Sequence, residues 1–163
     1  MAAKPFVVPP EHLALLRDLV YRLRDTPRLS AADAEKLRRK VTARRATKIL
    51  AKAGPEEGSA RAIDLSDSRP HLKILDLPAS ALKDEMARIR WKLGAQVAIV
   101  DEALNYWFDA GELVPSFYPE QISVILQKAK SAAWERAFLA VFGHHLAAEH
   151  AMTYSSLIDR PKC

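Results

Sequence analysis

The residues in this sequence that are best suited to chemistry are the cations between Lys36 and Lys52. Eight of these 17 residues are Lys or Arg, and no Asp or Glu lies among them. At 100° per residue, five of the cations fall on one side of a helix, which we call the basic face: Lys40, Arg44, Arg45, Lys48 and Lys52. Ammonium and guanidinium groups in this arrangement are suited to binding phosphate oxygens.

The spacing of these charges favours an anionic partner. Opposite charges at i and i+4 stabilise a helix, and like charges destabilise it. Here the pairs at that spacing are like pairs: Lys40–Arg44, Arg44–Lys48 and Lys48–Lys52. Phosphates would relieve the repulsion, and each neutralised phosphate also releases counterions. We therefore expect a nucleic-acid-binding site that contains Arg38, Arg39, Lys40, Arg44, Arg45, Lys48 and Lys52.

Other interpretations of this segment remain open. It could be a solubilising surface that pairs with Glu56, Glu57, Asp64 or Asp67. It could also bind an acidic protein, as part of a helical adaptor or chaperone-like protein that forms a homodimer. A membrane partner is not expected, because the apolar side of the helix is small and has no aromatic anchor. The connection 26–30 before it is longer than a helix-turn-helix turn and has no glycine, so that motif is not indicated.

A second basic group surrounds Trp91. Arg88, Arg90 and Lys92 flank this tryptophan, and an arginine beside an exposed tryptophan can stack on nucleic-acid bases. Such a tryptophan more often borders the core, with its arginines in ion pairs such as Asp84–Arg88 at i,i+4. This group is therefore the minor candidate.

The histidines do not form a metal-binding pattern. His145 and Glu149 stand at i,i+4, next to His144 and His150, but a site needs three or four ligands at a recognisable spacing. We expect no metal and no cofactor. The sequence also has no Gly-rich phosphate loop and no nucleophilic Ser motif, so we expect a protein that is not an enzyme.

Composition agrees with a folded protein that has one basic end. The 163 residues are 49% hydrophobic and 28% charged, with a net charge of +5. Residues 1–53 hold 13 Lys and Arg against 5 Asp and Glu, whereas the remaining residues hold 12 against 15. The single cysteine, Cys163, cannot form an internal disulfide, and neither a signal peptide nor a membrane span is visible, so a cytoplasmic protein is expected.

Hydrophobic spacing and caps predict helices almost throughout. The third expected helix is the most regular, with apolar residues three or four positions apart from Leu82 to Trp107. The predicted helices cover residues 10–25, 31–53 with Ser30 as N-cap, 82–110, 119–142 and 144–158, with a loop at 54–70 and an extended segment at 71–77. We divide the chain into a basic N-terminal segment at 1–53, a connector at 54–78 and a helical core at 79–163.

The expected fold is all-α, a bundle of four or five helices around a long central antiparallel pair, formed by the third and fourth helices. The stripe from Leu82 to Trp107 and the apolar run from Ala132 to Phe142 offer more apolar surface than one small bundle covers. Three consecutive aromatic residues, 106–108, point in three directions, so one of them is expected to meet a partner or a covering loop. These features predict self-association.

Overall fold

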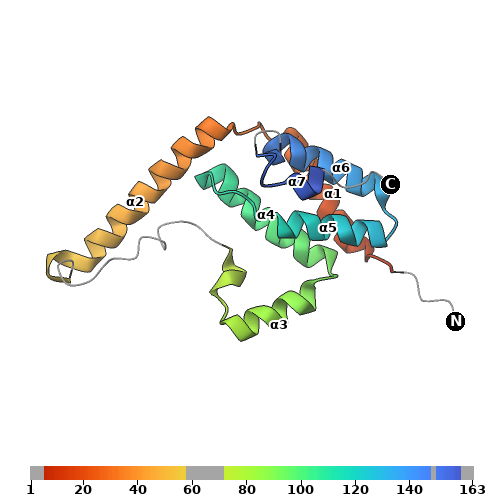
Figure 1. The fold of residues 1–163 in the computed structure, drawn as a ribbon, viewed down its shortest axis with the longest axis horizontal. Coiled ribbons are helices and arrows are strands. Elements are labelled where there is room, and N and C mark those ends of the chain that lie inside the picture. Colours follow the sequence, from red (N-terminus) through yellow and green to blue (C-terminus); the bar gives the residue numbers. More distant parts are fainter. Residues whose placement is uncertain (1–5, 58–71, 148–149, 159–163) are drawn as a thin grey trace.

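The computed structural model describes residues 6–57, 72–147 and 150–158, with side chains for all of these except 48–57, 156 and 158. All regular structure in that part of the chain is helical, which confirms the all-α prediction (Figure 1). The α-helices are α1 (Pro10–Asp25), α2 (Ala31–Glu57), α3 (Ala79–Ile89), α4 (Leu93–Ala110), α5 (Phe117–Lys128), α6 (Ala132–Phe142) and α7 (Ser155–Ile158). A 3-10 turn, η2 (Lys73–Asp76), and a π-helical turn, η3 (Gly143–Ala147), complete the order.

Three of the four ends of the first two helices are as the sequence predicts. Proline occupies the first position of α1, and Thr26 leaves the helical region with its N–H bound to the carbonyl of Leu23. The Ser30 hydroxyl accepts the backbone N–H of Asp33 at 3.1 Å, which is the N-cap contact. The predicted stop of α2 at residues 54–55 is wrong, because the helix continues to Glu57. A proline there removes one hydrogen bond of the last turns but has a φ that a helix accepts.

The predicted third helix is two helices, α3 and α4, separated by the turn 90–92. Lys92 has φ −100° and ψ 102°, which is outside the helical region. Carbonyl groups freed by the break find side-chain donors, since the amide of Gln96 donates to Ile89 O at 3.1 Å and that of Gln121 to Arg90 O at 2.7 Å. Tertiary hydrogen bonds thus stabilise a turn that the apolar spacing alone does not reveal.

The predicted fourth helix is also divided, into α5 and α6, and it begins two residues earlier than expected. Lys130 lies in the left-handed region with φ 55°. The N–H of Lys130 binds Gln127 O at 3.0 Å, and the N–H of Ser131 binds Leu126 O at 2.8 Å. These two bonds are the Schellman arrangement that ends helices, here with lysine at the position that glycine usually occupies.

Two further segments differ from the expectation. The extended segment at 71–77 contains η2 instead, whose first N–H, on Lys73, donates to Glu102 Oε2 at 2.9 Å (His71 lies outside the described residues). The last predicted helix, 144–158, is η3 followed by turns and the short α7. Buried Tyr154 ties this end to the rest, because its hydroxyl donates to Val114 O at 2.7 Å.

The core is built around α4, which packs against α1, α2, α3 and α5, while α6 closes the far side of α1 and α5. Its largest fully buried side chains are Trp107, Tyr154, Phe138, Phe142, Leu16, Leu23, Leu93, Leu104, Ile122, Ile125, Leu126 and Leu146. Most of the apolar stripes at 82–107 and 132–142 are therefore covered within the chain. Trp107 is buried, whereas Tyr106 and Phe108 are partly buried against the same core.

Candidate nucleic-acid interface

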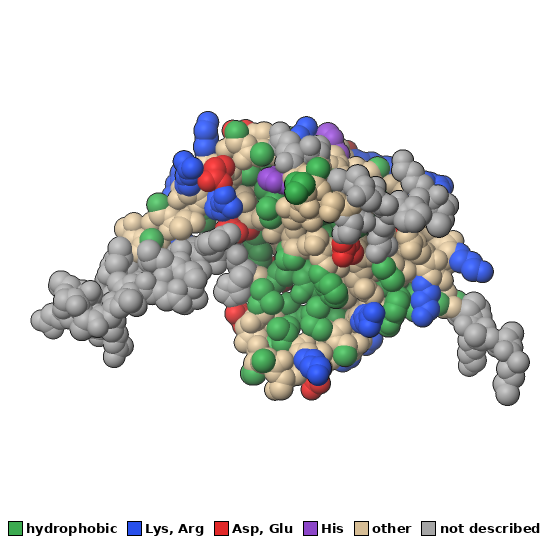
Figure 2. Space-filling view, viewed as in Figure 1, with side chains coloured by type: hydrophobic (Ala, Val, Ile, Leu, Met, Phe, Trp, Pro, Cys, Tyr) green, Lys and Arg blue, Asp and Glu red, His purple; other side chains and the backbone are tan. Residues whose placement is uncertain are grey.

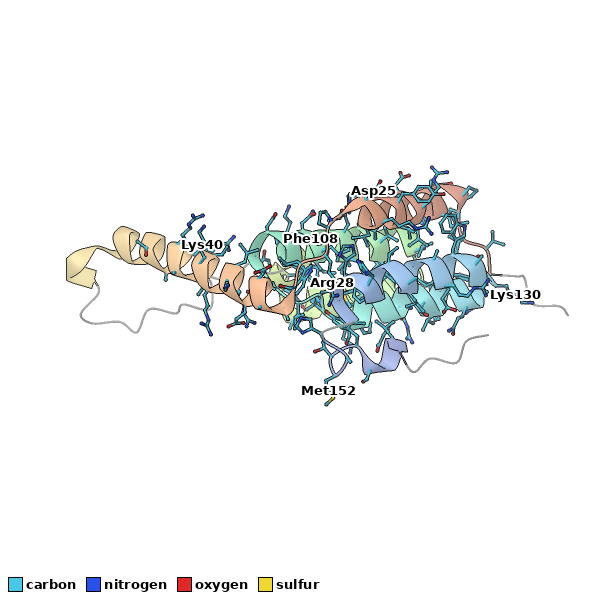
Figure 3. All side chains as sticks on the ribbon, turned by 90° about the horizontal axis from the view of Figure 1, so that it is seen from above. Asp25, Arg28, Lys40, Phe108, Lys130 and Met152 are labelled. Carbon is cyan, nitrogen blue, oxygen red and sulfur yellow. The ribbon has the colours of Figure 1, made fainter. Side chains whose placement is uncertain are left out.

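The candidate site lies on α2, a helix whose first turns contact the core and which packs against α4. Ala34 is buried, and its backbone carbonyl faces Gly111, the glycine that ends α4. Beyond this contact α2 projects away from the other helices, as both views of the ribbon show (Figures 1 and 3). Lys40, labelled in Figure 3, is on the projecting part. Lys40, Arg44 and Arg45 are thus exposed on an arm that a large ligand can reach.

An acidic residue just before the cluster, Glu35, changes the charge of its first turn. Its carboxylate forms an ion pair with Arg38 and accepts a hydrogen bond from the Nε of Arg39 at 3.1 Å. The hydrogen bond from Arg38 lowers the pKa of Glu35, so that the carboxylate is charged at neutral pH. Two of the predicted phosphate-binding residues therefore already have an anionic partner within the chain. Our sequence prediction missed this because it counted charges from Lys36 onward.

Three cations of the basic face remain exposed beyond that turn: Lys40, Arg44 and Arg45. Within the described residues, neither Lys40 nor Arg44 is in an ion pair. Arg45 lies near Tyr106 of α4, whose pKa is raised by burial and by its hydrogen bond to Glu102, and which feels the charge of Arg45 in the opposite direction. The backbone of Lys48 and Lys52 continues the helix, but their side chains lie outside the described set.

Small side chains separate the arginines on one side of α2. An open hollow of about 390 Å³ is lined there by Arg38, Arg39, Thr42, Ala43 and Ala46. None of the last three is large enough to keep a ligand backbone away from the guanidinium groups. This side of α2 can therefore admit a phosphate chain, with Glu35 as the competitor for Arg38.

The second basic group is not arranged as the sequence suggests. Arg88 pairs with Glu85 and not with Asp84, and its Nε lies 2.9 Å from Glu85 Oε2. The hydrogen bond from Arg88 lowers the pKa of Glu85. Trp91 is 37% exposed in the turn between α3 and α4, beside Arg90.

The histidines have structural contacts. His145 is buried, and its Nε2 donates to Leu23 O at 2.7 Å, which joins η3 to the end of α1. The ring of His150 meets Trp107 edge-on at 5.5 Å. Among the residues that the structure describes, no three His, Cys, Asp or Glu side chains gather as metal ligands would. Glu149 lies outside that set.

An apolar surface lies on the face seen in Figure 2, near η2 and the start of α5. Large apolar side chains are exposed in this part of the chain: Leu75 of η2, Leu77 just after it and Phe117 at the first position of α5, at 51%, 39% and 49% exposure. A hollow of about 160 Å³ beside it is lined by Leu72, Leu75, Ala103, Tyr106, Glu112, Leu113 and Pro115. None of these three residues belongs to the apolar stripes at 82–107 and 132–142, and self-association stays a prediction.

A scan of protein-family models, a search of curated proteins and a search of solved structures each found no match to this chain. Among the described helices, none combines the length and the apolar character that crossing a membrane requires.

Proposed function

We propose that this chain is a non-enzymatic nucleic-acid-binding protein that contacts phosphates through α2, in a regulatory or accessory role within a cytoplasmic nucleoprotein complex. The observation that carries the proposal is the set of exposed cations, Lys40, Arg44 and Arg45, on a helix that projects from the core. A helix that repeats like charges at i,i+4 is destabilised unless an anion neutralises them. A polyphosphate chain supplies anions at regular intervals along such a helix.

In this proposal the remaining helices form a bundle that holds the arm in place. We infer that α4 and α5 are its central antiparallel pair, and that the turns of α2 next to Ala34 fix the direction of the arm. Contacts to phosphate carry no sequence information, so binding through the basic face is independent of base sequence.

The test compares two variants that each remove three exposed cations. The first is Lys40→Gln, Arg44→Gln, Arg45→Gln on the arm, and the control is Arg17→Gln, Lys83→Gln, Arg136→Gln on α1, α3 and α6. Glutamine keeps the helix propensity of lysine and arginine close to unchanged. Both variants have the same net charge, so any difference between them reports the position of the charges.

Binding to duplex DNA is measured against salt concentration. The arm variant is expected to bind all sequences more weakly to the same degree, with a log–log salt slope shallower by about 0.9 for each phosphate that it no longer neutralises, up to about 2.7. The control variant is expected to keep the slope of the parent. A further variant, Glu35→Gln, frees Arg38 and Arg39 and is expected to bind more tightly with a steeper slope. Equal slopes in the arm variant and the parent would overturn the proposal.

A second candidate function has one observation in its favour, the exposure of three large apolar side chains, Leu75, Leu77 and Phe117. Exposed apolar patches mark protein–protein contacts, so the chain could be a helical adaptor that binds an acidic protein or a second copy of itself. Sedimentation of the parent and of a Leu75→Ser, Phe117→Ser variant tests whether the chain binds a second copy of itself through these residues. A self-associating parent and a monomeric variant would favour the adaptor function.

A further inference from the structure

The turn between α3 and α4 brings together aromatic and cationic side chains from three distant parts of the chain. Trp91 stands in this turn, the ring of Phe6 meets it edge-on with centroids 6.0 Å apart, and Lys128 comes from the last turn of α5. The Lys128 Nζ lies 4.4 Å from the Trp91 ring centroid and 5.4 Å from that of Phe6. The guanidinium of Arg90 lies 5.5 Å from the Trp91 centroid. We call this group the Trp91 cluster.

Trp91 differs from the other two tryptophans of the chain. Trp107 is 1% exposed, and Trp134 packs against the hydrophobic core. Trp91 is 37% exposed and lies outside that core. The backbone under it is held firmly, because Gln121 and Gln96 bind the carbonyls of Arg90 and Ile89. A large aromatic ring is thus partly exposed on a turn whose backbone is hydrogen-bonded to two side chains.

The charges around the ring are positive. Within the described residues, Arg90 and Lys128 are in no ion pair, and Lys130 follows two residues after Lys128. Lys92 is close enough to Glu85 to contribute to the lowered pKa of that carboxyl. The combination of an exposed indole and unpaired cations is the chemistry that binds single-stranded nucleic acid, by base stacking and phosphate neutralisation.

We propose that the Trp91 cluster is a second nucleic-acid contact, which binds single-stranded segments by stacking an unpaired base on Trp91 while Arg90 and Lys128 neutralise adjacent phosphates. A duplex does not satisfy this site, because its bases are already stacked on one another. Lys128 now covers the indole, but a cation over an exposed ring is held weakly, and a stacked base is held more tightly. The ammonium then moves from the ring to the phosphate beside that base. This inference rests on the proposed function and assigns a preferred form of nucleic acid to it.

The experiment measures binding of an oligothymidylate of about 16 nucleotides, near the upper site size of one stacking domain, and of a duplex of equal length. All three tryptophans fluoresce, so the signal of Trp91 is the part of the quenching that Trp91→Phe removes, while buried Trp107 and core-packed Trp134 contribute a background common to both proteins. Oligothymidylate is expected to quench the fluorescence of the parent, and the duplex is expected to quench it much less. Trp91→Phe is expected to abolish the quenching and keep most of the affinity, because phenylalanine still stacks.

Affinity separates this site from the arm. Trp91→Ala is expected to weaken oligothymidylate binding about 5- to 150-fold, the range for removal of one stacked base, and to change duplex binding less than about twofold. Lys128→Gln is expected to weaken the same complex and to flatten its salt dependence. Lys83→Gln, on the outer side of α3, is the matched control and is expected to leave both complexes unchanged.

The Trp91 cluster and the basic face of α2 can be tested separately. Unchanged oligothymidylate affinity in Trp91→Ala, together with no quenching in the parent, would overturn the inference even if the arm variant fails to bind duplex. Quenching of the parent that Trp91→Phe loses, together with weaker affinity in Trp91→Ala and Lys128→Gln, would support the inference even if the arm variant binds duplex as the parent does. Should Trp91→Ala fail to fold, the quenching measurement decides the question. Quenching of the parent and of Lys128→Gln by oligothymidylate would support the inference, and its absence in both would overturn it.

Discussion

Replacing Gly111 by alanine tests the contact that fixes the arm. Gly111 ends α4 with φ 69° and ψ 21°, a left-handed conformation that costs a residue with a Cβ about 1–2 kcal/mol. A Cβ at this position would overlap the carbonyl oxygen of Ala34 and lie 2.9 Å from its carbonyl carbon. Because the neighbour is backbone, α2 itself must shift, and overpacking of this kind costs about 1–3 kcal/mol more. Gly111→Ala is therefore expected to lower the free energy of unfolding by about 2–5 kcal/mol.

Gly143→Ala is the matched control, since it adds the same methyl group elsewhere. Gly143 has helical φ −60° and ψ −42°, and a Cβ there meets only the Cβ of Ala147 at 4.0 Å. This substitution is expected to stabilise the protein by about 0.5–1 kcal/mol, because glycine loses more conformational entropy on folding than alanine. Urea denaturation followed by circular dichroism measures both variants. If Gly111→Ala unfolds at the same urea concentration as Gly143→Ala, α2 does not pack on the end of α4 as described.

Two further substitutions test the turn after α5 and the alkaline limit of stability. Lys130→Gly is expected to raise the free energy of unfolding by up to about 1 kcal/mol in urea denaturation, because glycine adopts the left-handed φ of 55° without a Cβ penalty; a less stable variant would contradict this account of the turn. Burial raises the pKa of Tyr154, so the folded state keeps the phenolic proton more tightly than the unfolded state, and this stability is present below the unfolded pKa of about 10 and lost as the pH rises above it. The urea midpoint of the parent is expected to fall as the pH is raised above that value, and the midpoint of Tyr154→Phe is expected to fall less. An equal fall in the two proteins would refute the assignment.

The N-cap at Ser30 and the stop at Thr26 were predictable because their signals are local, whereas the equally local signal at residues 54–55 did not end α2. Ser30 lies three residues before the N–H that it accepts, and the stop at Thr26 follows from the proline after it. The break at 90–92 was not predictable in the same way, because Gln121 is 31 residues away in the sequence from the carbonyl that it binds. The turn at Lys130 has the hydrogen bonds of a glycine cap without the glycine, so residue type does not indicate it.

The candidate sites divide in the same way between local and long-range signals. A run of cations on one helix is visible in the sequence, and so is Glu35, which precedes Arg38 by three residues and Arg39 by four. The Trp91 cluster needed the fold, because Phe6 and Lys128 reach Trp91 from opposite directions along the chain. Periodicity also assigned the stripe from Leu82 to Trp107 to an interface, whereas the break in the helix allows the chain to cover most of it.

The two proposed contacts lie at opposite ends of α4, and this placement bears on the kind of ligand. The carboxyl end of α4 meets the start of the arm at Gly111, and Trp91 precedes its amino end. An 18-residue helix is about 27 Å long, so one ligand must be extended to neutralise both regions. A nucleic acid with a duplex part and a single-stranded part meets that requirement. Affinity is therefore expected to rise with oligonucleotide length until both contacts are spanned, and no further, and an affinity independent of length would show that one ligand does not use both contacts.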